Sequence, residues 1–173
     1  MFFETDEAFI HIDMKTVQTR NIGDYTTSIF VAQNQNSYSS NFQVRSKAGI
    51  VTRSYSGNLP MEYNVEGKMK PCLTYFLTIL YEELNTAPKF KVLNINILCM
   101  PNGHLATRYG SRVFKAGKNP DKVRFNFSAV ESFELLDEPK PKRIRIVYFN
   151  EDMDNKWKSK LKYLKSVYDK QNI

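Results

Sequence analysis

Asp13 and Lys15 are the residues of this sequence whose types and spacing most clearly suggest chemistry. They lie two residues apart in the stretch FIHIDMKT, residues 9–16. A carboxylate such as Asp13 can hold a hard divalent cation, and Mg2+ takes oxygen ligands of this kind while keeping several waters. A lysine ammonium beside it can orient an attacking water and stabilise charge that develops on a phosphate. Taken alone, the D-x-K spacing is a weak signal, because a surface strand can also carry an Asp and a Lys.

The stretch around this pair predicts a β-strand, because aromatic and β-branched residues are crowded into residues 9–16. Successive side chains of a strand point to opposite faces. We therefore expect Asp13 and Lys15 to share one open face with His11. The alternate positions, expected in the core, are Ile10, Ile12 and Met14.

The size and composition of the chain fit one folded domain with a sizeable core. It has 173 residues, of which 42% are hydrophobic and 13% aromatic. No apolar run reaches the roughly 18–20 residues of a membrane helix, and the first residues lack the basic start of a signal peptide. Cys72 and Cys99 lie in apolar runs without metal-ligand spacing. We therefore expect a cytoplasmic protein without a membrane segment, with both thiols buried and reduced.

The positive charge of the chain is concentrated in its last third. The net charge is +7, and residues 140–173 hold ten Lys and Arg against four Asp and Glu. A basic surface of this kind suggests a polyanionic partner, with nucleic acid as the first choice. A solvated lysine face without a partner is the alternative interpretation.

Hydrophobic periodicity predicts the elements around the first strand. Apolar residues at three- and four-residue spacing predict a helix that begins at Pro71 and ends before Pro88. A second helix is expected over residues 154–170, with Trp157 on its apolar face. Residues 19–24 are expected to form a hairpin turn, and residues 41–69 to be irregular with room for one short hairpin. Further strands are expected over residues 27–32, 90–100, 122–127 and 143–149.

The alternation in residues 122–127 places basic and amide side chains on one face of a strand. Val123, Phe125 and Phe127 are expected in the core, while Lys122 and Arg124 face outward with Asn126. Arg and Lys pair with guanine and Asn with adenine in the major groove, which admits a two-stranded ribbon. Strand 143–149 is likewise expected to present Arg143 and Arg145. The polar run 33–40 has side chains that can bond bases or phosphates, although its composition also fits an ordinary loop.

Four short pieces, in chain order, resemble motifs of the type II restriction endonucleases of the PD-(D/E)XK superfamily, closest to the BglI and ScaI-like enzymes. Residues 9–15 resemble the metal-binding strand with its D-x-K, and Asn34-Gln35 resembles an Asn-Gln pair at similar spacing. Residues 100–103 resemble a V-P-N-G turn. Residues 116–118 and 122–124 resemble a P-G-K loop and an R-V-R strand that read bases in this family.

The resemblance implies a fold, a cofactor and partners. The implied fold is an α/β restriction-endonuclease-like core, with a mixed central β-sheet flanked by helices, of the EcoRV-like branch. It would form a single nuclease domain over residues 1–173, with an N-terminal portion missing as the alternative. The implied protein is a Mg2+-dependent homodimer on double-stranded DNA that leaves 5′-phosphates. A cognate DNA methyltransferase acting on the same site would be its partner.

The resemblance also assigns roles to individual residues. Asp13 would be a metal ligand and Lys15 the catalytic lysine. Lys122 stands where the family has an Arg, and Lys cannot copy the planar bidentate fork of a guanidinium. The residues that the motifs and the strand pattern together assign to DNA contact are Asn34, Gln35, Lys118, Lys122, Arg124 and Asn126.

The family also needs a first carboxylate upstream of the D-x-K, and only twelve residues precede Asp13. Asp6 and Glu4 are the two candidates for this catalytic and metal-binding role, and Asp6 is preferred because Glu4 would need a longer return of the chain. If one of them reaches the cation, the chain is expected to be an active, site-specific endonuclease. If neither does, it is expected to be a non-catalytic DNA-binding remnant. A repair or recombination nuclease of low sequence specificity is the remaining enzymatic alternative.

Overall fold

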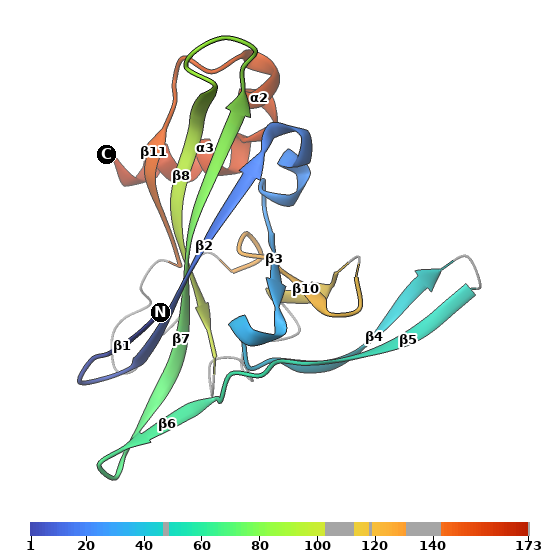
Figure 1. Cartoon of the computed structure of the whole chain (residues 1–173), viewed down its shortest axis with the longest axis vertical. Helices are drawn as coiled ribbons and strands as arrows, with labels where there is room; N and C mark the ends of the chain where they lie inside the picture. Colours follow the sequence, from blue (N-terminus) through green and yellow to red (C-terminus); the bar gives the residue numbers. More distant parts are fainter. Residues whose placement is uncertain (47–48, 103–112, 118, 131–142, 173) are drawn as a thin grey trace.

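The computed structural model describes residues 1–46, 49–102, 113–117, 119–130 and 143–172. Its central feature is a six-stranded sheet in the order β1-β2-β7-β8-β11, with β6 paired to β7 outside this path (Figure 1). The strands are β1 (Phe2–Glu4), β2 (Phe9–Gln18), β6 (Glu62–Val65), β7 (Lys68–Glu83), β8 (Phe90–Pro101) and β11 (Ile144–Phe149).

The sheet is mixed, as the resemblance to restriction endonucleases implied. Strand β2 runs parallel to β7, whereas the other neighbouring strands pair in the antiparallel sense. In the parallel pair, Asp13 lies beside Phe76 and Lys15 beside Thr78. The predicted strands 9–16, 90–100 and 143–149 are therefore confirmed as β2, β8 and β11.

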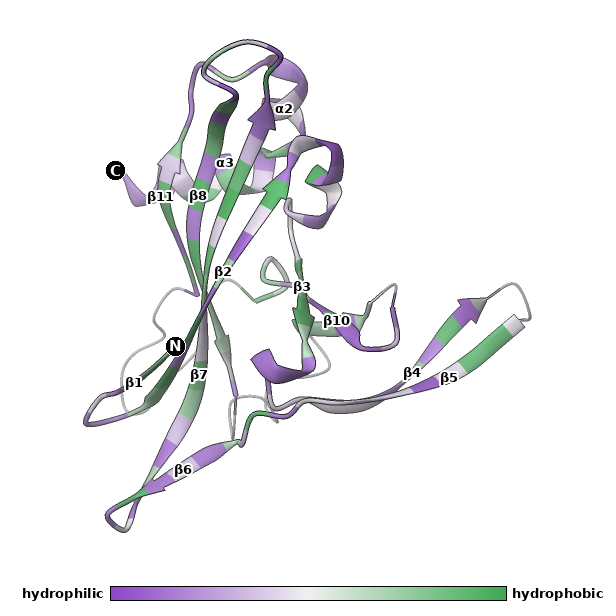
Figure 2. Cartoon of the chain, viewed as in Figure 1, coloured by the Kyte–Doolittle hydropathy of each residue, from purple (hydrophilic) through white to green (hydrophobic). Residues whose placement is uncertain are grey.

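A smaller antiparallel sheet packs against the large one. It has the order β3-β10-β9, formed by Ile29–Ala32, Lys122–Phe125 and Phe114–Ala116. Phe125 faces Phe76 of β7, with 6.5 Å between ring centroids, and both side chains are fully buried. The core therefore lies between the two sheets, and the predicted inward residues of strand 122–127 are confirmed. Figure 2 shows hydrophobic segments along β3 and the long strands of the large sheet.

Helices cover only part of the large sheet in the described residues. The predicted C-terminal helix is divided into α2 (Asn155–Lys160) and α3 (Lys162–Gln171) at the buried Leu161. Helix α3 packs against β11 through Tyr168, whose ring stacks on that of Phe149 with the ring centroids 5.6 Å apart. Two short 3-10 helices follow β2 and β3, namely η1 (Thr19–Asp24) and η2 (Gln33–Gln35). No helix among the described residues is long and apolar enough to span a membrane.

The helix expected after Pro71 is wrong, because residues 68–83 form the central strand β7. The apolar residues of this stretch fit a helical spacing, but they also alternate. Thr74, Phe76, Thr78 and Leu80 are all fully buried on the side of the smaller sheet. Strand β7 pairs with β2 on one edge and β8 on the other, and these pairings satisfy its backbone hydrogen bonds. Both partners are distant in the chain, so the local spacing of apolar residues cannot reveal them.

The expected core position of Met14 in β2 is wrong, although Ile10 is partly buried against the core. Met14 is 65% exposed, whereas Asp13 and Lys15 lie on the side of the large sheet that the smaller sheet partly covers. The alternation of β2 was therefore recognised correctly, but the choice of the buried face was wrong for Met14. The reason is that Phe76, which neighbours Asp13, belongs to the core between the sheets.

Arg143 is a second correction, because it was expected to face outward and is only 1% exposed. Its Nε donates a hydrogen bond to the carbonyl oxygen of Val130 at 2.8 Å, and the guanidinium lies 6.0 Å from the ring centroid of Phe125. Arg145, on the same strand, is exposed as expected. Arg143 therefore contributes to the packing of β11 and does not extend the basic surface.

Residues 41–69, which were expected to be largely irregular, contain a long hairpin. Its strands are β4 (Ser39–Ser46) and β5 (Gly49–Ser56), and the hairpin projects away from both sheets (Figure 1). The hairpin turn expected at residues 19–24 is absent, because η1 leads from β2 into the smaller sheet. Cys72 and Cys99 are buried free thiols, as expected, and burial raises the pKa of the Cys72 thiol to about 11.

Candidate active site

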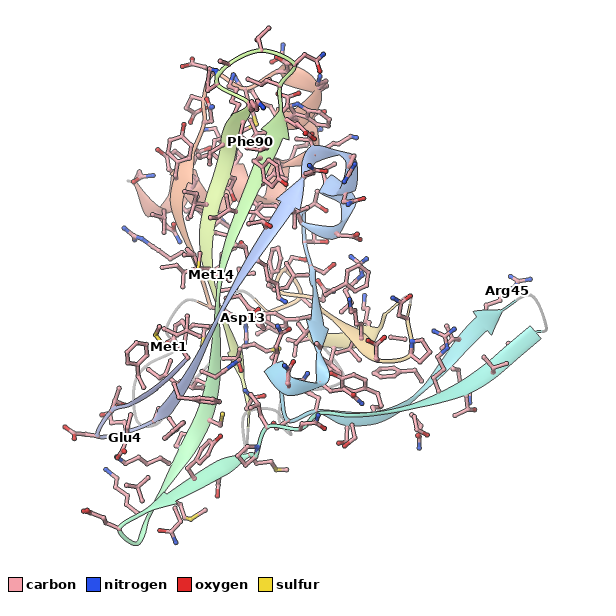
Figure 3. All side chains as sticks on the ribbon, viewed as in Figure 1. Met1, Glu4, Asp13, Met14, Arg45 and Phe90 are labelled. Carbon is pink, nitrogen blue, oxygen red and sulfur yellow. The ribbon has the colours of Figure 1, made fainter. Side chains whose placement is uncertain are left out.

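Asp13, which is labelled in Figure 3, lies near the middle of β2 and forms a close ion pair with Lys15. The ammonium nitrogen of Lys15 lies 3.2 Å from Oδ2 of Asp13, and the two side chains are 20% and 27% exposed. The same nitrogen lies 5.1 Å from the ring centroid of Phe76. The pair is therefore partly desolvated by the core beneath it while remaining open to a ligand.

Gln35, from η2, bonds to both members of the pair. Its Nε2 donates to Oδ2 of Asp13 at 2.8 Å, and its Oε1 accepts from Nζ of Lys15 at 2.9 Å. Oε1 also accepts from the backbone N–H of Ala32 at 2.9 Å. Because a backbone N–H can only donate, this bond fixes which end of the amide faces Asp13. The structure thus brings Asp13, Lys15 and Gln35 together from two separate parts of the chain.

A buried hydrogen-bond network fixes η2 to the large sheet. Oγ1 of Thr74 donates to the carbonyl oxygen of Gln35 at 2.9 Å, and Nδ2 of Asn102 donates to Thr74 at 2.8 Å. Oδ1 of Asn102 accepts from the backbone N–H of Ser37 at 2.9 Å. Thr74 and Asn102 are fully buried. Asn102 belongs to the P-N-G motif, whose sequence marked a turn but gave no sign that it would position Gln35.

The charge of Lys15 is affected by this environment. Burial lowers the pKa of Lys15 below its ordinary value, because removal from water disfavours the ammonium form. The negative charge of Asp13 and its hydrogen bond act in the opposite direction. Lys15 therefore releases its proton more readily than an exposed lysine, and its proton affinity depends on Asp13.

The structure does not bring Glu4 or Asp6 to Asp13. Glu4 pairs with Phe9 in the β1–β2 ladder, and its carboxylate accepts from Nζ of Lys70 at 2.6 Å. Since Phe9 and Asp13 are four strand residues apart, Glu4 lies about 13 Å along β2 from the pair, as its position in Figure 3 illustrates. Asp6 is exposed in the turn between β1 and β2.

The donor set of the site is one carboxylate. Among the residues that the structure describes, no three His, Cys, Asp or Glu side chains gather where they could share a metal ion. A single Asp is nevertheless compatible with Mg2+, which proteins hold through one or two carboxylates together with substrate phosphates and waters. Asp13 therefore fits a cation whose remaining ligands come from outside the protein.

A pocket of about 440 Å3 extends from Lys15 along η1 and β3. Its lining includes Asp24, Arg20 and Asn21, which follow β2 directly. Arg20 and Asn21 are exposed, and the sequence marked them only as part of a polar turn. The pocket thus adds polar and cationic groups beside the Asp13–Lys15 pair.

No described residue among those expected to contact DNA lines this pocket, but Arg124 is ion-paired with Asp24, which does. Arg124 donates from NH2 to Asp24 at 2.6 Å and from NH1 to Ser28 at 2.8 Å, so its guanidinium is held in place and is 26% exposed in its side chain. Lys122 and Asn34 are exposed, and the side-chain oxygen of Asn126 accepts from Ser128. Lys118 lies outside the described residues. Among the members of this set that the structure describes, Gln35 alone is hydrogen-bonded to the Asp13–Lys15 pair.

The arrangement of the two sheets matches solved structures of restriction endonucleases. The crystal structure of the restriction endonuclease BglI bound to its DNA recognition sequence matches with a TM-score of 0.55 and 17% identity, over 70% of this chain and 50% of that one. The tetrameric restriction endonuclease SfiI bound to cognate DNA matches with a TM-score of 0.57 and 18% identity, over 84% and 55%. The chain spans about half the length of these structures. Its fold is therefore the α/β restriction-endonuclease-like core, as the resemblance implied.

Family models give the assignment at the level of sequence. Residues 1–86 match the model of the N-terminal domain of the type II restriction enzyme MwoI, and residues 92–149 match the model of its central domain. The chain belongs to this family of type II restriction endonucleases and resembles BglI. No curated protein matches it by sequence.

Proposed function

We propose that residues 1–173 form a single nuclease domain of a type II site-specific deoxyribonuclease. It would hydrolyse phosphodiester bonds of duplex DNA as a Mg2+-dependent homodimer and leave 5′-phosphates. A DNA methyltransferase of the same specificity would protect the host site. The observation that carries this proposal is the Asp13–Lys15 ion pair, which is 3.2 Å long and bound by Gln35, with Lys15 also lining a pocket.

Asp13 and Lys15 would have different roles in the hydrolysis. Asp13 would hold Mg2+ together with phosphate oxygens of the DNA, and bound Mg2+ offsets the negative charge that develops on the phosphate. Lys15 would orient the attacking water with Nζ. Because burial lowers the pKa of Lys15, its neutral form is more accessible than that of an exposed lysine and can accept a proton from that water. Gln35 would hold the Asp13 carboxylate and the Lys15 amine in their relative positions through its two hydrogen bonds.

Plasmid cleavage tests this proposal. The purified chain is incubated with supercoiled plasmid and Mg2+, and the ends of any products are sequenced. We expect breaks at one defined sequence with 5′-phosphates, and we expect Asp13→Ala and Lys15→Ala to abolish cleavage while duplex binding persists. Met14→Ala is the matched control, because Met14 is 65% exposed on the opposite face of β2 and does not line the pocket. Cleavage by Asp13→Ala at the wild-type rate would show that Asp13 has no role in catalysis.

A second candidate function is duplex DNA binding without cleavage. It is favoured by one observation, namely that Glu4 is paired with Lys70 and Asp6 lies in an exposed turn, so neither reaches Asp13. The two candidates differ in a direct measurement. A chain that retards duplex DNA in a gel, but leaves plasmid intact across a range of Mg2+ and Mn2+ concentrations, would support the binding function and contradict the nuclease.

A further inference from the structure

The β4–β5 hairpin is the most extended feature of the molecule outside the two sheets. Its strands pair along eight positions, from Ser39 opposite Ser56 to Ser46 opposite Gly49. Eight residues of strand extend about 26 Å. Figure 3 places Arg45 near the outer end of this hairpin, well away from Asp13. The hairpin is therefore long enough to follow a groove of a large ligand.

The two faces of the hairpin differ in character. On one face, Asn41 lies opposite Ser54 and Gln43 opposite Thr52, and all four side chains are exposed. Arg45 is also exposed on this face, towards the outer end. We call this set of residues the polar face. It carries hydrogen-bonding side chains at successive outward positions, except that Ile50, opposite Arg45, is apolar and 75% exposed.

The opposite face secures the hairpin to the body of the protein. Tyr55 is buried, and its ring centroid lies 5.6 Å from that of Phe114 in β9. Phe42 packs against the same ring at 6.1 Å. Apolar packing at the inner end therefore determines which face is turned outward, and the polar face has no part in it.

Hydrogen bonds across the strands fix the two amides on the polar face. Nε2 of Gln43 donates to Oγ1 of Thr52 at 2.9 Å, and Oγ of Ser54 donates to Oδ1 of Asn41 at 2.8 Å. Asn and Gln are the residue types that pair with adenine in the major groove, and Arg pairs with guanine. The polar face thus presents side chains that can hydrogen-bond base edges, and the cross-strand bonds hold the two amides in fixed positions.

The charge of the hairpin favours a polyanion. Residues 39–56 contain Arg45, Lys47 and Arg53 but no Asp or Glu. A two-stranded β-ribbon fits the major groove of B-DNA, and basic residues gain affinity there by releasing counterions from phosphates. The width of a two-stranded ribbon and the positive charge of this hairpin therefore both favour duplex DNA as the ligand.

The inner end of the hairpin is connected directly to the candidate active site. Asn36 follows Gln35 in the chain, and its Nδ2 donates to the hydroxyl of Tyr55 at 2.6 Å. The backbone N–H of Gly57 donates to the carbonyl oxygen of Tyr38 at 2.6 Å. A side chain at Gly57 would place its Cβ 2.3 Å from the carbonyl oxygen of Asn36, so a glycine is needed for this approach. The hairpin therefore begins where the Asp13–Lys15 pair is held.

We propose that the β4–β5 hairpin lies in the major groove of duplex DNA and that Asn41, Gln43 and Arg45 contact base edges there. The proposal rests on the proposed function, which supplies duplex DNA as the substrate. It adds a recognition element to the 122–127 strand and the Asn34-Gln35 pair that the sequence motifs indicated.

Selection from a randomised duplex pool tests the hairpin. The full chain selects duplexes in EDTA, so that cleavage does not occur, and the enriched molecules are sequenced. We expect a defined sequence from the wild-type chain. Asn41→Ala, Gln43→Ala and Arg45→Ala should each relax the preference at their own base positions. On the selected duplex, each variant should bind roughly 10-fold more weakly or worse, with a smaller loss on a random duplex of equal length.

Two control variants are matched to these changes. Ser40→Ala removes an exposed polar group from the other face of the hairpin, and Arg145→Ala removes an exposed arginine from β11. Both should retain the selected sequence. Thermal unfolding followed by circular dichroism should give every variant the wild-type midpoint, because none of the substituted side chains is buried.

The outcomes separate this inference from the nuclease proposal. Binding that selects a sequence through the polar face, without plasmid cleavage in Mg2+, would support the hairpin and contradict the nuclease. Site-specific cleavage with all three variants selecting the wild-type sequence would do the reverse. Failure of the chain to bind duplex DNA, or a preference for single strands of the same sequence, would overturn the hairpin inference.

Discussion

Gln35 donates a hydrogen bond to Asp13 across 2.8 Å, although 22 residues separate them in the chain. The same amide accepts from Lys15, so one side chain is shared by both members of the candidate catalytic pair. The resemblance to restriction endonucleases offered Gln35 as a DNA contact. Its observed partners favour a positioning role instead, in which Gln35 would act through Asp13 and Lys15.

Removal of the Gln35 amide should therefore impair cleavage more than DNA binding. Residues that orient a metal ligand typically cost 10- to 100-fold when they are lost, so we expect Gln35→Ala to reduce kcat by about this factor with little change in KM. Steady-state kinetics on a duplex with the cleavage site measures both constants. Gln33→Ala is the control, since it removes a similar amide at the start of η2. A change confined to KM would assign Gln35 to DNA contact.

Removing the charge of Asp13 and removing the charge of Lys122 should shift the pKa of Lys15 in opposite directions. Asp13 raises the pKa of Lys15, so Asp13→Asn should lower it further. Lys122 lowers that pKa through charge repulsion, so Lys122→Ala should raise it. The 13Cε chemical shift of Lys15, followed by NMR as the pH rises, measures both effects. Shifts in the same direction for the two variants would contradict this electrostatic account.

Arg124 should distinguish between base sequences, because its guanidinium is held in a fixed orientation. Asp24 and Ser28 hold the group in one orientation, so Arg124→Ala should cost about 1–3 kcal/mol on the preferred duplex and much less on random DNA. Arg124→Lys should not restore the preference, because an ammonium lacks the planar fork. Fluorescence anisotropy on both duplexes gives the comparison. Equal losses on the two duplexes would place Arg124 among the phosphate contacts.

Asn102 should contribute to stability as well as to the site. Asn102→Ala would remove an acceptor of the partly buried N–H of Ser37 and the donor to the fully buried hydroxyl of Thr74. An unsatisfied buried group costs about 1–3 kcal/mol, and we expect a loss of this size in the free energy of unfolding, measured with urea. Asn58→Ala, at an exposed asparagine, should have almost no effect.

The parts of the fold that the sequence predicted well are strands with strong alternation and a simple environment. Val123, Phe125 and Phe127 form an apolar row that only one face can accommodate, so strand 122–127 could be predicted with its buried side. The D-x-K motif likewise located Asp13 and Lys15. Their contact with Gln35 could not be derived, because it depends on how η2 is held by Thr74 and Asn102.

The errors have physical causes in tertiary structure. Strand β7 contains apolar residues at both two-residue and four-residue spacing, and only its two neighbouring strands decide between sheet and helix. Met14 was assigned to the core because it is apolar, but the smaller sheet covers the other side of β2. The β4–β5 hairpin is longer than the one short hairpin expected in residues 41–69, because most of it lies outside any core and its sequence shows little hydrophobic periodicity.

The parallel pairing of β2 with β7 also has a consequence for how the protein folds. Phe9 pairs with Cys72, more than sixty residues further along the chain. Such a contact requires closure of a long loop before it contributes any stability, and contacts of this kind form slowly. During synthesis, Asp13 and Lys15 emerge from the ribosome long before their neighbouring strand exists. The nascent chain therefore carries both residues without the support of β7, and the pair becomes ordered only when a long segment that follows it has been made.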